Sequence, residues 1–352
     1  MHRFDEVQFE QAKAVHSRAT VVVSHDHMMN LDSFKQMREG GVTAKILHML
    51  VDALPWAKTK EEYQYSISEF EGWTKRALVA IDQVRSLVAN SPDVACLALT
   101  VEDIREAKVE GKAAVLMGFE GGKPLEGSLE VLRCLYQLGV RHMQLTWAFN
   151  NQIAGTQDDP ENTGLTPFGH QVVREMNRLG MVIDLSHLSR KAMQDVYEIT
   201  EDPVINSHAG SRVLAESTAN LSDAALKQLA ENGGVVGVHF CAHLIKTGAR
   251  RASIDDLLDQ VAYIADLVGI DHVGLGPDYF DYNEDFRRNT MHFYEDAYQN
   301  NDFDLSWVEG LEDYSKFPAL TGRMLQRGFS EEDIIKVLGG NLLRVFRKVF
   351  GR

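Results

Sequence analysis

Short apolar runs rich in β-branched residues alternate with longer stretches of helical periodicity along most of the chain. Because these runs are apolar throughout, without regular polar positions, they are typical of strands buried on both faces of a sheet. The helical pattern is clearest at Phe168–Leu179, where Gly180 follows as a helix stop, and at Ile254–Val268. The eight predicted strands are Thr20–His25, Ala44–Leu50, Ala113–Glu120, His142–Trp147, Met181–His187, Pro203–His208, Gly234–Phe240 and His272–Asp278.

Eight strands separated by helices predict an α/β fold with parallel crossovers, closed into a (β/α)8 TIM barrel. A doubly wound open sheet is the alternative, although it does not normally use eight consecutive units in this way. We expect a single domain over residues 1–352, since barrels routinely reach ~250 residues or more as one domain. Two connections are long: residues 51–112 after the second strand, mostly helical, and Tyr279–Ser315 after the eighth, irregular and rich in aromatic and acidic residues. A connection of the second kind is usually a lid or a binding loop.

Charge and cysteine content narrow the class of protein. The 352 residues include 36 Lys+Arg and 51 Asp+Glu, a net charge of −15, and 44% are hydrophobic, which is enough for a large core. We expect no nucleic-acid partner and no anionic membrane partner, because both require clustered Lys and Arg. No run approaches the ~18 apolar residues of a membrane span, and the first 19 residues lack the apolar centre of a secretory signal. Three scattered cysteines predict no disulfide framework, and therefore a reducing, cytoplasmic location.

Imidazole and carboxylate side chains stand at the ends of five predicted strands. They are His25, His27, Glu120, His187, His208 and Asp278. In a barrel the carboxyl ends of all strands meet at one mouth, so we expect these side chains to lie together. His25 and His27 are two apart on an extended chain and therefore point the same way, whereas Asp26 points the opposite way. A single histidine at a strand end is more often a hydrogen-bonded core residue than a ligand, but six such residues with one polarity predict a site for zinc or a similar divalent ion.

Longer stretches of the sequence carry a family resemblance. They are GFEGGKPL (118–125), LGVRHMQLTW (138–147), ENTGLTPFG (161–169), VVREMNRLGMVIDLSHLS (172–189), PVINSHAGSR (203–212), GLGPDY (274–279), EGLEDYSKFP (309–318) and NLLRVF (341–346). In these stretches the chain resembles the membrane (renal) dipeptidase family, the M19 metallopeptidases of the amidohydrolase superfamily, from about residue 20 to the C-terminus. The resemblance implies a (β/α)8 barrel with two divalent metal ions, zinc being expected, bridged by a glutamate. By this resemblance Glu120 is the bridging ligand, His25 and His27 hold one ion, and His187 and His208 hold the other. Family habit also implies a homodimer.

The chemistry of such a centre fits amide hydrolysis independently. A metal-bound water has its pKa lowered toward ~7, so a hydroxide that bridges the two ions is available at neutral pH. Asp278, which the resemblance makes the proton-handling carboxylate, takes the proton and delivers it to the leaving nitrogen. We therefore expect a zinc-dependent hydrolase of the dipeptidase type, with a dipeptide or another small amide as its small-molecule substrate. The alternatives are a hydrolase of a lactone or other ester on the same centre, and a catalytically inactive binding protein; the retained ligands speak against the latter.

Three positions depart from the family pattern. His27 replaces the usual Asp of the first-strand motif, which removes a negative charge from the first metal site and bears on the preferred metal. Trp147 stands where the family has a His that contacts the substrate carbonyl, a donor whose loss costs ~10²–10³ in rate when nothing replaces it. Trp147 and His239 are therefore expected at the substrate, with His243 as a second replacement donor; alternatively, His239 is merely packed in the core. Ala219 stands where the family has an Arg that grips the substrate's C-terminal carboxylate.

The last departure predicts poor binding of free dipeptides. Other cations could replace the missing Arg, although solvent exposure is the simpler expectation for each; they are Lys246, Arg250, Arg287 and Arg288, with Arg212 a turn or more away. The loop after the eighth strand carries many aromatic residues: Tyr279, Phe280, Tyr282, Phe286, Phe293, Tyr294, Tyr298, Phe303 and Trp307. Over the barrel mouth such a loop favours a bulky apolar amide. Alternatively, it packs on its neighbours, or on a second subunit, without touching substrate.

Overall fold

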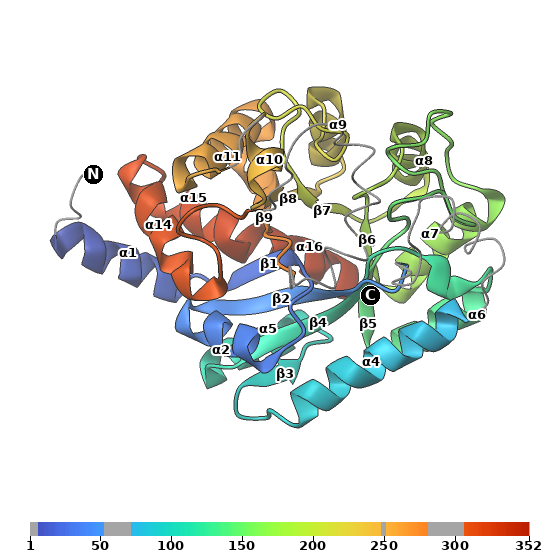
Figure 1. The fold of residues 1–352 in the computed structure, drawn as a ribbon, viewed down its shortest axis with the longest axis horizontal. Helices are drawn as coiled ribbons and strands as arrows, with labels where there is room; N and C mark the ends of the chain where they lie inside the picture. Colours follow the sequence, from blue (N-terminus) through green and yellow to red (C-terminus); the bar gives the residue numbers. More distant parts are fainter. Residues whose placement is uncertain (1–5, 53–71, 248–250, 281–305, 352) are drawn as a thin grey trace.

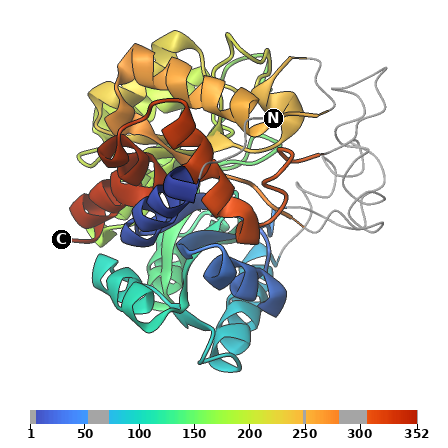
Figure 2. The same ribbon diagram turned by 90° about the vertical axis from the view of Figure 1, so that its left-hand side faces the viewer.

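A ring of parallel strands enclosed by helices forms the centre of the molecule (Figure 1, Figure 2). The computed structural model describes residues 6–52, 72–247, 251–280 and 306–351. The strands are β1 Val21–Asp26, β2 Val42–Met49, β3 Ala95–Leu97, β4 Ala113–Phe119, β5 Val140–Gln144, β6 Val182–Asp184, β7 Ile205–Ala209, β8 Val235–His239 and β9 Val273–Gly276. The helices are α1 Glu6–Arg18, α2 Leu31–Glu39, α4 Trp73–Ala89, α5 Val101–Glu110, α6 Leu129–Gln137, α7 Pro167–Leu179, α8 Arg190–Ile199, α9 Asp223–Glu231, α10 Ala242–Ile245, α11 Ile254–Val268, α14 Phe317–Gln326, α15 Glu331–Ile335 and α16 Asn341–Phe350, with short helical turns η1 Lys123–Leu125, η2 Ile270–His272, η3 Tyr314–Lys316 and η4 Lys336–Gly340.

The predicted closed barrel is confirmed. Strands run in the order β2-β1-β9-β8-β7-β6-β5-β4, every pairing is parallel, and a further pairing of β2 with β4 closes the ring. The ninth strand, β3, lies outside the ring and pairs with the first half of β4, while β5 pairs with the second half. Closure leaves all eight barrel strands pointing the same way, so their carboxyl ends form one mouth.

Each of the eight predicted runs overlaps a barrel strand, but several boundaries and one element differ. The run expected at Met181–His187 is a strand only over Val182–Asp184, and both β2 and β5 begin two residues earlier than expected, at Val42 and Val140. Within the connection at 51–112, which we expected to be mostly helical, the sequence analysis missed the short strand β3 between α4 and α5. Most of the long connection after the eighth strand, residues 281–305, lies outside the described residues.

The two clearest predicted helices form with the signals that their sequences carry. Thr166 caps α7 by accepting a hydrogen bond from the Gly169 N–H, and Gly180 ends the helix with φ 73°, a left-handed conformation that favours glycine. In α11 the Ser253 side chain and the Asp256 side chain each bond the other's backbone N–H, a reciprocal capping box. Local sequence therefore fixes where these crossover helices start and stop.

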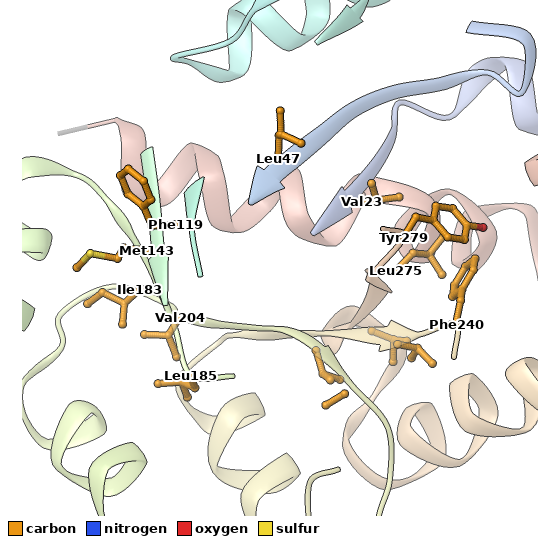
Figure 3. Close-up of a cluster of buried hydrophobic side chains, with 14 of the residues drawn as sticks. Val23, Leu47, Phe119, Met143, Ile183, Leu185, Val204, Phe240, Leu275 and Tyr279 are labelled. Atoms are coloured by element: carbon orange, nitrogen blue, oxygen red, sulfur yellow. The ribbon is translucent and has the colours of Figure 1, made fainter. Parts of the chain in front are cut away.

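The hydrophobic core lies mainly between the barrel and its helices. Figure 3 shows labelled members of this cluster, such as Val23, Leu47 and Phe119, pointing outward from the ring of strands. A second cluster joins residues inside the barrel, such as Ile46, to Phe346 and its neighbours on α16. Asn341 at the start of α16 donates to the carbonyl oxygen of Val273, the first residue of β9, so α16 covers the amino ends of the strands. The carboxyl ends are left to form a site.

Candidate functional site

The six residues predicted for the metal centre meet at the carboxyl end of the barrel. His25 and His208 lie within β1 and β7, Glu120 directly follows β4, and the remaining three follow β1, β6 and β9 within three residues. His25, Glu120 and His208 are buried, whereas His27, His187 and Asp278 are partly exposed. Asp26 points away from this cluster, as expected, because its carboxylate accepts hydrogen bonds from Lys45 and Tyr314.

Glu120 lies between two pairs of histidines. Its Oε2 is 3.1 Å from the Nε2 of His27, and its Oε1 is 3.0 Å from the Nε2 of His187. Within each pair the Nε2 atoms face each other at 3.0 Å, His25 with His27 and His187 with His208. The ligand atoms of His25, His27 and Glu120 lie within 4.8 Å of one another, as do those of Glu120, His187 and His208. Each carboxylate oxygen thus lies close to one histidine of a different pair, His27 or His187, which is the arrangement expected of a bridging ligand.

The other ring nitrogen of three of these histidines is held from outside the cluster. The Nδ1 of His27 lies 2.9 Å from the carbonyl oxygen of His48, which only accepts, so Nδ1 carries a proton and Nε2 is the ring nitrogen left to face the cluster. The Nδ1 atoms of His25 and His208 are both 3.0 Å from the Ser207 hydroxyl. Outer partners of this kind orient histidines that ligate metals. Lone pairs of imidazole that face a carboxylate at these separations fit two divalent cations of the zinc type.

Asp278 stands beside the first histidine pair. Its Oδ1 is 3.3 Å from the Nε2 of both His25 and His27, and its Oδ2 is 3.0 Å from the Nε2 of His239. Burial alone would raise the pKa of Asp278, but the neighbouring His25 and the hydrogen bond from His239 hold it well below its usual range. Burial likewise opposes ionisation of Glu120, whereas His27 and His187 hold the pKa of Glu120 well below its ordinary value. Both groups are therefore carboxylates at neutral pH.

Two of the site residues have a left-handed backbone. We expected His187 and Asp278 to end strands, but β6 and β9 stop at Asp184 and Gly276, and the two residues have φ of 63° and 55°. That conformation costs a residue other than glycine about 1–2 kcal/mol. Outliers of this kind cluster at functional sites, where the surrounding structure holds them. Here the turn out of each strand brings the side chain over the mouth.

A second group of polar side chains, which the sequence analysis missed, forms the floor below the histidine cluster. The His48 ring stacks on His25 with centroids 3.8 Å apart, and His142 meets His48 edge-on at 4.5 Å. The Nε2 of His142 is 3.1 Å from the Oδ2 of Asp184. Gly118 on β4 makes the room, since a Cβ there would lie 2.7 Å from the Nδ1 of His142. Burial and the neighbouring imidazoles hold the pKa of His48 well below 6.5, so this ring is neutral. In the sequence, this group was indicated only by the position of His48, His142 and Asp184 on the inward faces of predicted strands.

A cavity of about 470 Å³ opens above the histidine cluster. Apolar side chains form much of its wall, including Met29, Leu47, Met49, Leu50, Val51, Ala80 and Leu244. The predicted substrate-contact residues Trp147 and His239 both line the cavity, and so do His243 and Ala219. The acidic residues at its surface are Glu120, Asp158 and Asp278, while no Lys or Arg in the described part of the chain lines it.

The cations considered as substitutes for the missing Arg lie elsewhere or outside the described residues. The guanidinium of Arg212 donates to the backbone carbonyl oxygens of Ser217, Thr218 and Asn220, so it holds the loop that carries Ala219. Lys246 is exposed and pairs with Asp256 at 2.8 Å. The other three lie outside the described residues; they are Arg250, Arg287 and Arg288.

Three of the nine aromatic residues predicted to cover the mouth are described. Tyr279 is buried and packs edge-on against Trp307, with ring centroids 5.9 Å apart. The indole N–H of Trp307 donates to the carbonyl oxygen of Asp278 at 3.3 Å, whereas Phe280 lines the cavity. In this part of the loop, then, two rings pack on neighbours and one reaches the cavity. The remaining six lie outside the described residues: Tyr282, Phe286, Phe293, Tyr294, Tyr298 and Phe303.

Comparison with known proteins gives consistent matches over the chain. The family model described as membrane dipeptidase, peptidase family M19, matches residues 9–288 and 301–350. Dipeptidase tcpJ of Claviceps purpurea is 34% identical over 292 residues, which are 82% of this chain and 64% of that protein. Dipeptidase aclJ of Aspergillus oryzae is 32% identical over 332 residues, 92% of this chain and 71% of that protein. This chain therefore spans less than two thirds of the length of the first of these relatives.

The fold also matches that of a solved structure. The crystal structure of an amidohydrolase from Pseudomonas aeruginosa is 29% identical and superimposes with a TM-score of 0.83, covering 97% of this chain and 99% of that one. None of the helices in the described ranges is both long enough and apolar enough to cross a membrane. The barrel and the position of its mouth are thus shared with a solved amidohydrolase.

Proposed function

Because the chain belongs to the membrane dipeptidase family, peptidase family M19, we propose that it is a metal-dependent hydrolase that cleaves the amide bond of a small molecule. The observation that carries the proposal is the position of Glu120 between two histidine pairs, with the Asp278 carboxylate 3.3 Å from one of them. Retention of every ligand at this spacing supports an active enzyme. A hydrolysis screen of the zinc-loaded protein tests it, with L-L and L-D dipeptides, N-acyl amino acids, lactams and lactones as substrates. Turnover of lactones alone would contradict the proposed amide bond.

Two divalent ions, with zinc as the expected metal, would be held by His25 and His27 on one side and His187 and His208 on the other, with Glu120 shared between them. Bound there, the ions would polarise the scissile carbonyl and lower the pKa of a coordinated water toward ~7. Nitrogen-rich ligands with one shared carboxylate suit zinc. Because a histidine ligand carries no negative charge where the family has an aspartate, the protein would supply less negative charge to the first ion.

Asp278 is the group that moves protons in this proposal. Its Oδ1 faces the reacting centre as a carboxylate, so it can accept a proton from the attacking water. The same oxygen then delivers that proton to the leaving nitrogen, which departs as a neutral amine because an amide anion is too poor a leaving group. The apolar wall of the cavity excludes water from the acyl part of the substrate.

The metal content gives the first test. Protein purified without chelator and reconstituted with zinc, manganese or cobalt should contain about two ions per chain, because two sets of ligand atoms converge on Glu120. Elemental analysis against protein concentration measures the ratio. Less than one ion per chain after reconstitution would contradict a dinuclear centre.

The substrate that fits this cavity lacks a free α-carboxylate. With acidic side chains and no described Lys or Arg on the wall, a buried α-carboxylate would lack the side-chain cation of the family pattern, and a hydrogen bond to a charged group is worth about 1.5–3 kcal/mol. We therefore expect kcat/KM for Ala-Ala to be at least ~10-fold below that for its C-terminal amide, since 1.4 kcal/mol is tenfold. Bulkier apolar amides should react better still. Steady-state kinetics on the pair measures the ratio.

The variant Ala219→Arg supplies the matched control for this substrate preference. Restoring a guanidinium at a position that lines the cavity should shift the preference toward the free carboxylate. If the unaltered protein strongly prefers Ala-Ala over its amide, another residue has replaced the missing Arg and the substrate argument is wrong.

The protein is proposed to be cytoplasmic and homodimeric. Cys96, Cys134 and Cys241 are all free, and Cys134 is exposed, which suits a reducing compartment such as the cytoplasm. A homodimer is proposed from the family resemblance. Sedimentation at micromolar concentration would measure its mass directly.

A further inference from the structure

His239, the last residue of β8, has its two ring nitrogens committed to different partners. The ring is buried, 3% exposed. Its Nδ1 lies 2.8 Å from the backbone nitrogen of Cys241, and a backbone N–H only donates, so Nδ1 must present its lone pair. The proton of this neutral imidazole therefore sits on Nε2. The backbone N–H of Cys241 thus selects the tautomer of the His239 ring.

The Nε2–H of His239 is directed at Asp278. It donates to Oδ2 over 3.0 Å, which leaves Oδ1 facing the Nε2 atoms of His25 and His27. The backbone of Asp278 is fixed separately, because its N–H donates to the carbonyl oxygen of His25 and its own carbonyl accepts from the Trp307 indole. These backbone hydrogen bonds do not prevent the Asp278 carboxylate from rotating about its side-chain bonds. The hydrogen bond from His239 restrains that rotation.

We propose that His239 is a positioning residue, which fixes the Asp278 carboxylate so that one oxygen stays aimed at the reacting centre. The inference rests on the proposed function, since it assigns a task within that reaction. It also gives His239 a role other than the substrate contact expected from the sequence, because its single N–H is already used by Asp278. Relay of a proton through the ring is excluded as well, since the Cys241 N–H occupies Nδ1.

Two amide side chains of different length, placed at position 239, distinguish a positioning role of His239 from other roles. In His239→Gln the side-chain amide reaches about as far as Nε2 and can still donate to Asp278, whereas in His239→Asn the amide ends near the position of Nδ1 and cannot. We expect His239→Asn to lower kcat by ~10–100-fold, the usual range for an outer partner of a metal site, with KM changed less than about twofold. We expect His239→Gln to recover most of the lost kcat. Both variants should keep the metal content of the unaltered protein.

His272→Asn is the matched control. The Nδ1 of His272 donates to the carbonyl oxygen of Gly234 at the opposite end of the barrel, so its loss should leave kcat unchanged. Equal loss in His239→Asn and His239→Gln would overturn the proposal in favour of a role that needs an imidazole. A raised KM with unchanged kcat would indicate substrate contact, and loss of metal in His239→Asn would indicate a structural role; either also overturns it.

Crystal structures of the zinc-loaded variants test the inference without turnover. We expect Oδ1 of Asp278 to keep its place beside His25 and His27 in His239→Gln, and to rotate away in His239→Asn. An unmoved carboxylate in His239→Asn would refute positioning even if the proposed hydrolysis is correct. A rotated carboxylate in a protein that hydrolyses no amide would instead refute the proposed function and leave the positioning role of His239 supported.

Discussion

Replacing Asp278 by asparagine should lower kcat by ~10³-fold or more, consistent with the ~10²–10⁴-fold that general acid–base catalysis contributes. Asparagine has nearly the shape of aspartate, and its amide oxygen can still accept the hydrogen bond from His239. The amide nitrogen then occupies the place of Oδ1, beside His25 and His27, and it cannot take a proton from the attacking water. Turnover is therefore lost while the five ligands stay in place.

Metal analysis and steady-state kinetics on the same preparation distinguish loss of proton transfer from loss of metal. We expect about two ions per chain in both the unaltered protein and Asp278→Asn. Asp255→Asn, which removes a surface carboxylate paired with Arg323, should change neither kcat nor metal content. A near-normal rate in Asp278→Asn on the best substrate of the screen would show that another group moves the proton.

The barrel could be predicted from the sequence because its strands are buried on both faces and so appear as unbroken apolar runs. Runs such as β4 (AAVLMGF) and β8 (VVGVH) show that pattern most clearly, whereas β5 (VRHMQ) and β7 (INSHA) also carry polar residues. β3 has the sequence Ala-Cys-Leu, is partly exposed and follows a turn that contains Pro92. A strand of that length gives no periodicity, and its pairing with β4 depends on a contact that local sequence does not encode.

The meeting of the proposed metal ligands could also be predicted, since parallel strand ends must converge at the mouth, but their hydrogen-bond partners could not. That His239 bonds Asp278 follows from the register of β8 on β9, where His239 lies opposite Gly276. His48 and His142 looked like ordinary core positions, because only the space left by Gly118 brings their rings together. The left-handed turns at His187 and Asp278 are imposed by the surrounding structure and have no local signal such as glycine.

Replacing Glu120 by glutamine should remove the dinuclear centre itself. The two carboxylate oxygens of Glu120 face different histidine pairs, so an amide can satisfy only one of them. Its nitrogen carries two protons and no lone pair for a cation, so it would point N–H groups at ring nitrogens that should bind metal. We expect the metal content to fall from about two ions per chain to one or fewer. Because loss of mere outer partners already costs ~10–100-fold, kcat should fall by more than ~10²-fold.

Glu175→Gln provides the matched control for Glu120→Gln. Glu175 lies on α7 and forms ion pairs with Arg178 and Arg133 on the outside of the barrel, so its loss should leave metal content and kcat unchanged. Elemental analysis after zinc reconstitution, followed by circular dichroism to confirm that the variant is folded, reports the result. If folded Glu120→Gln still holds two ions, the four histidines are enough to bind both of them. A bridging carboxylate would then not be required for a dinuclear site.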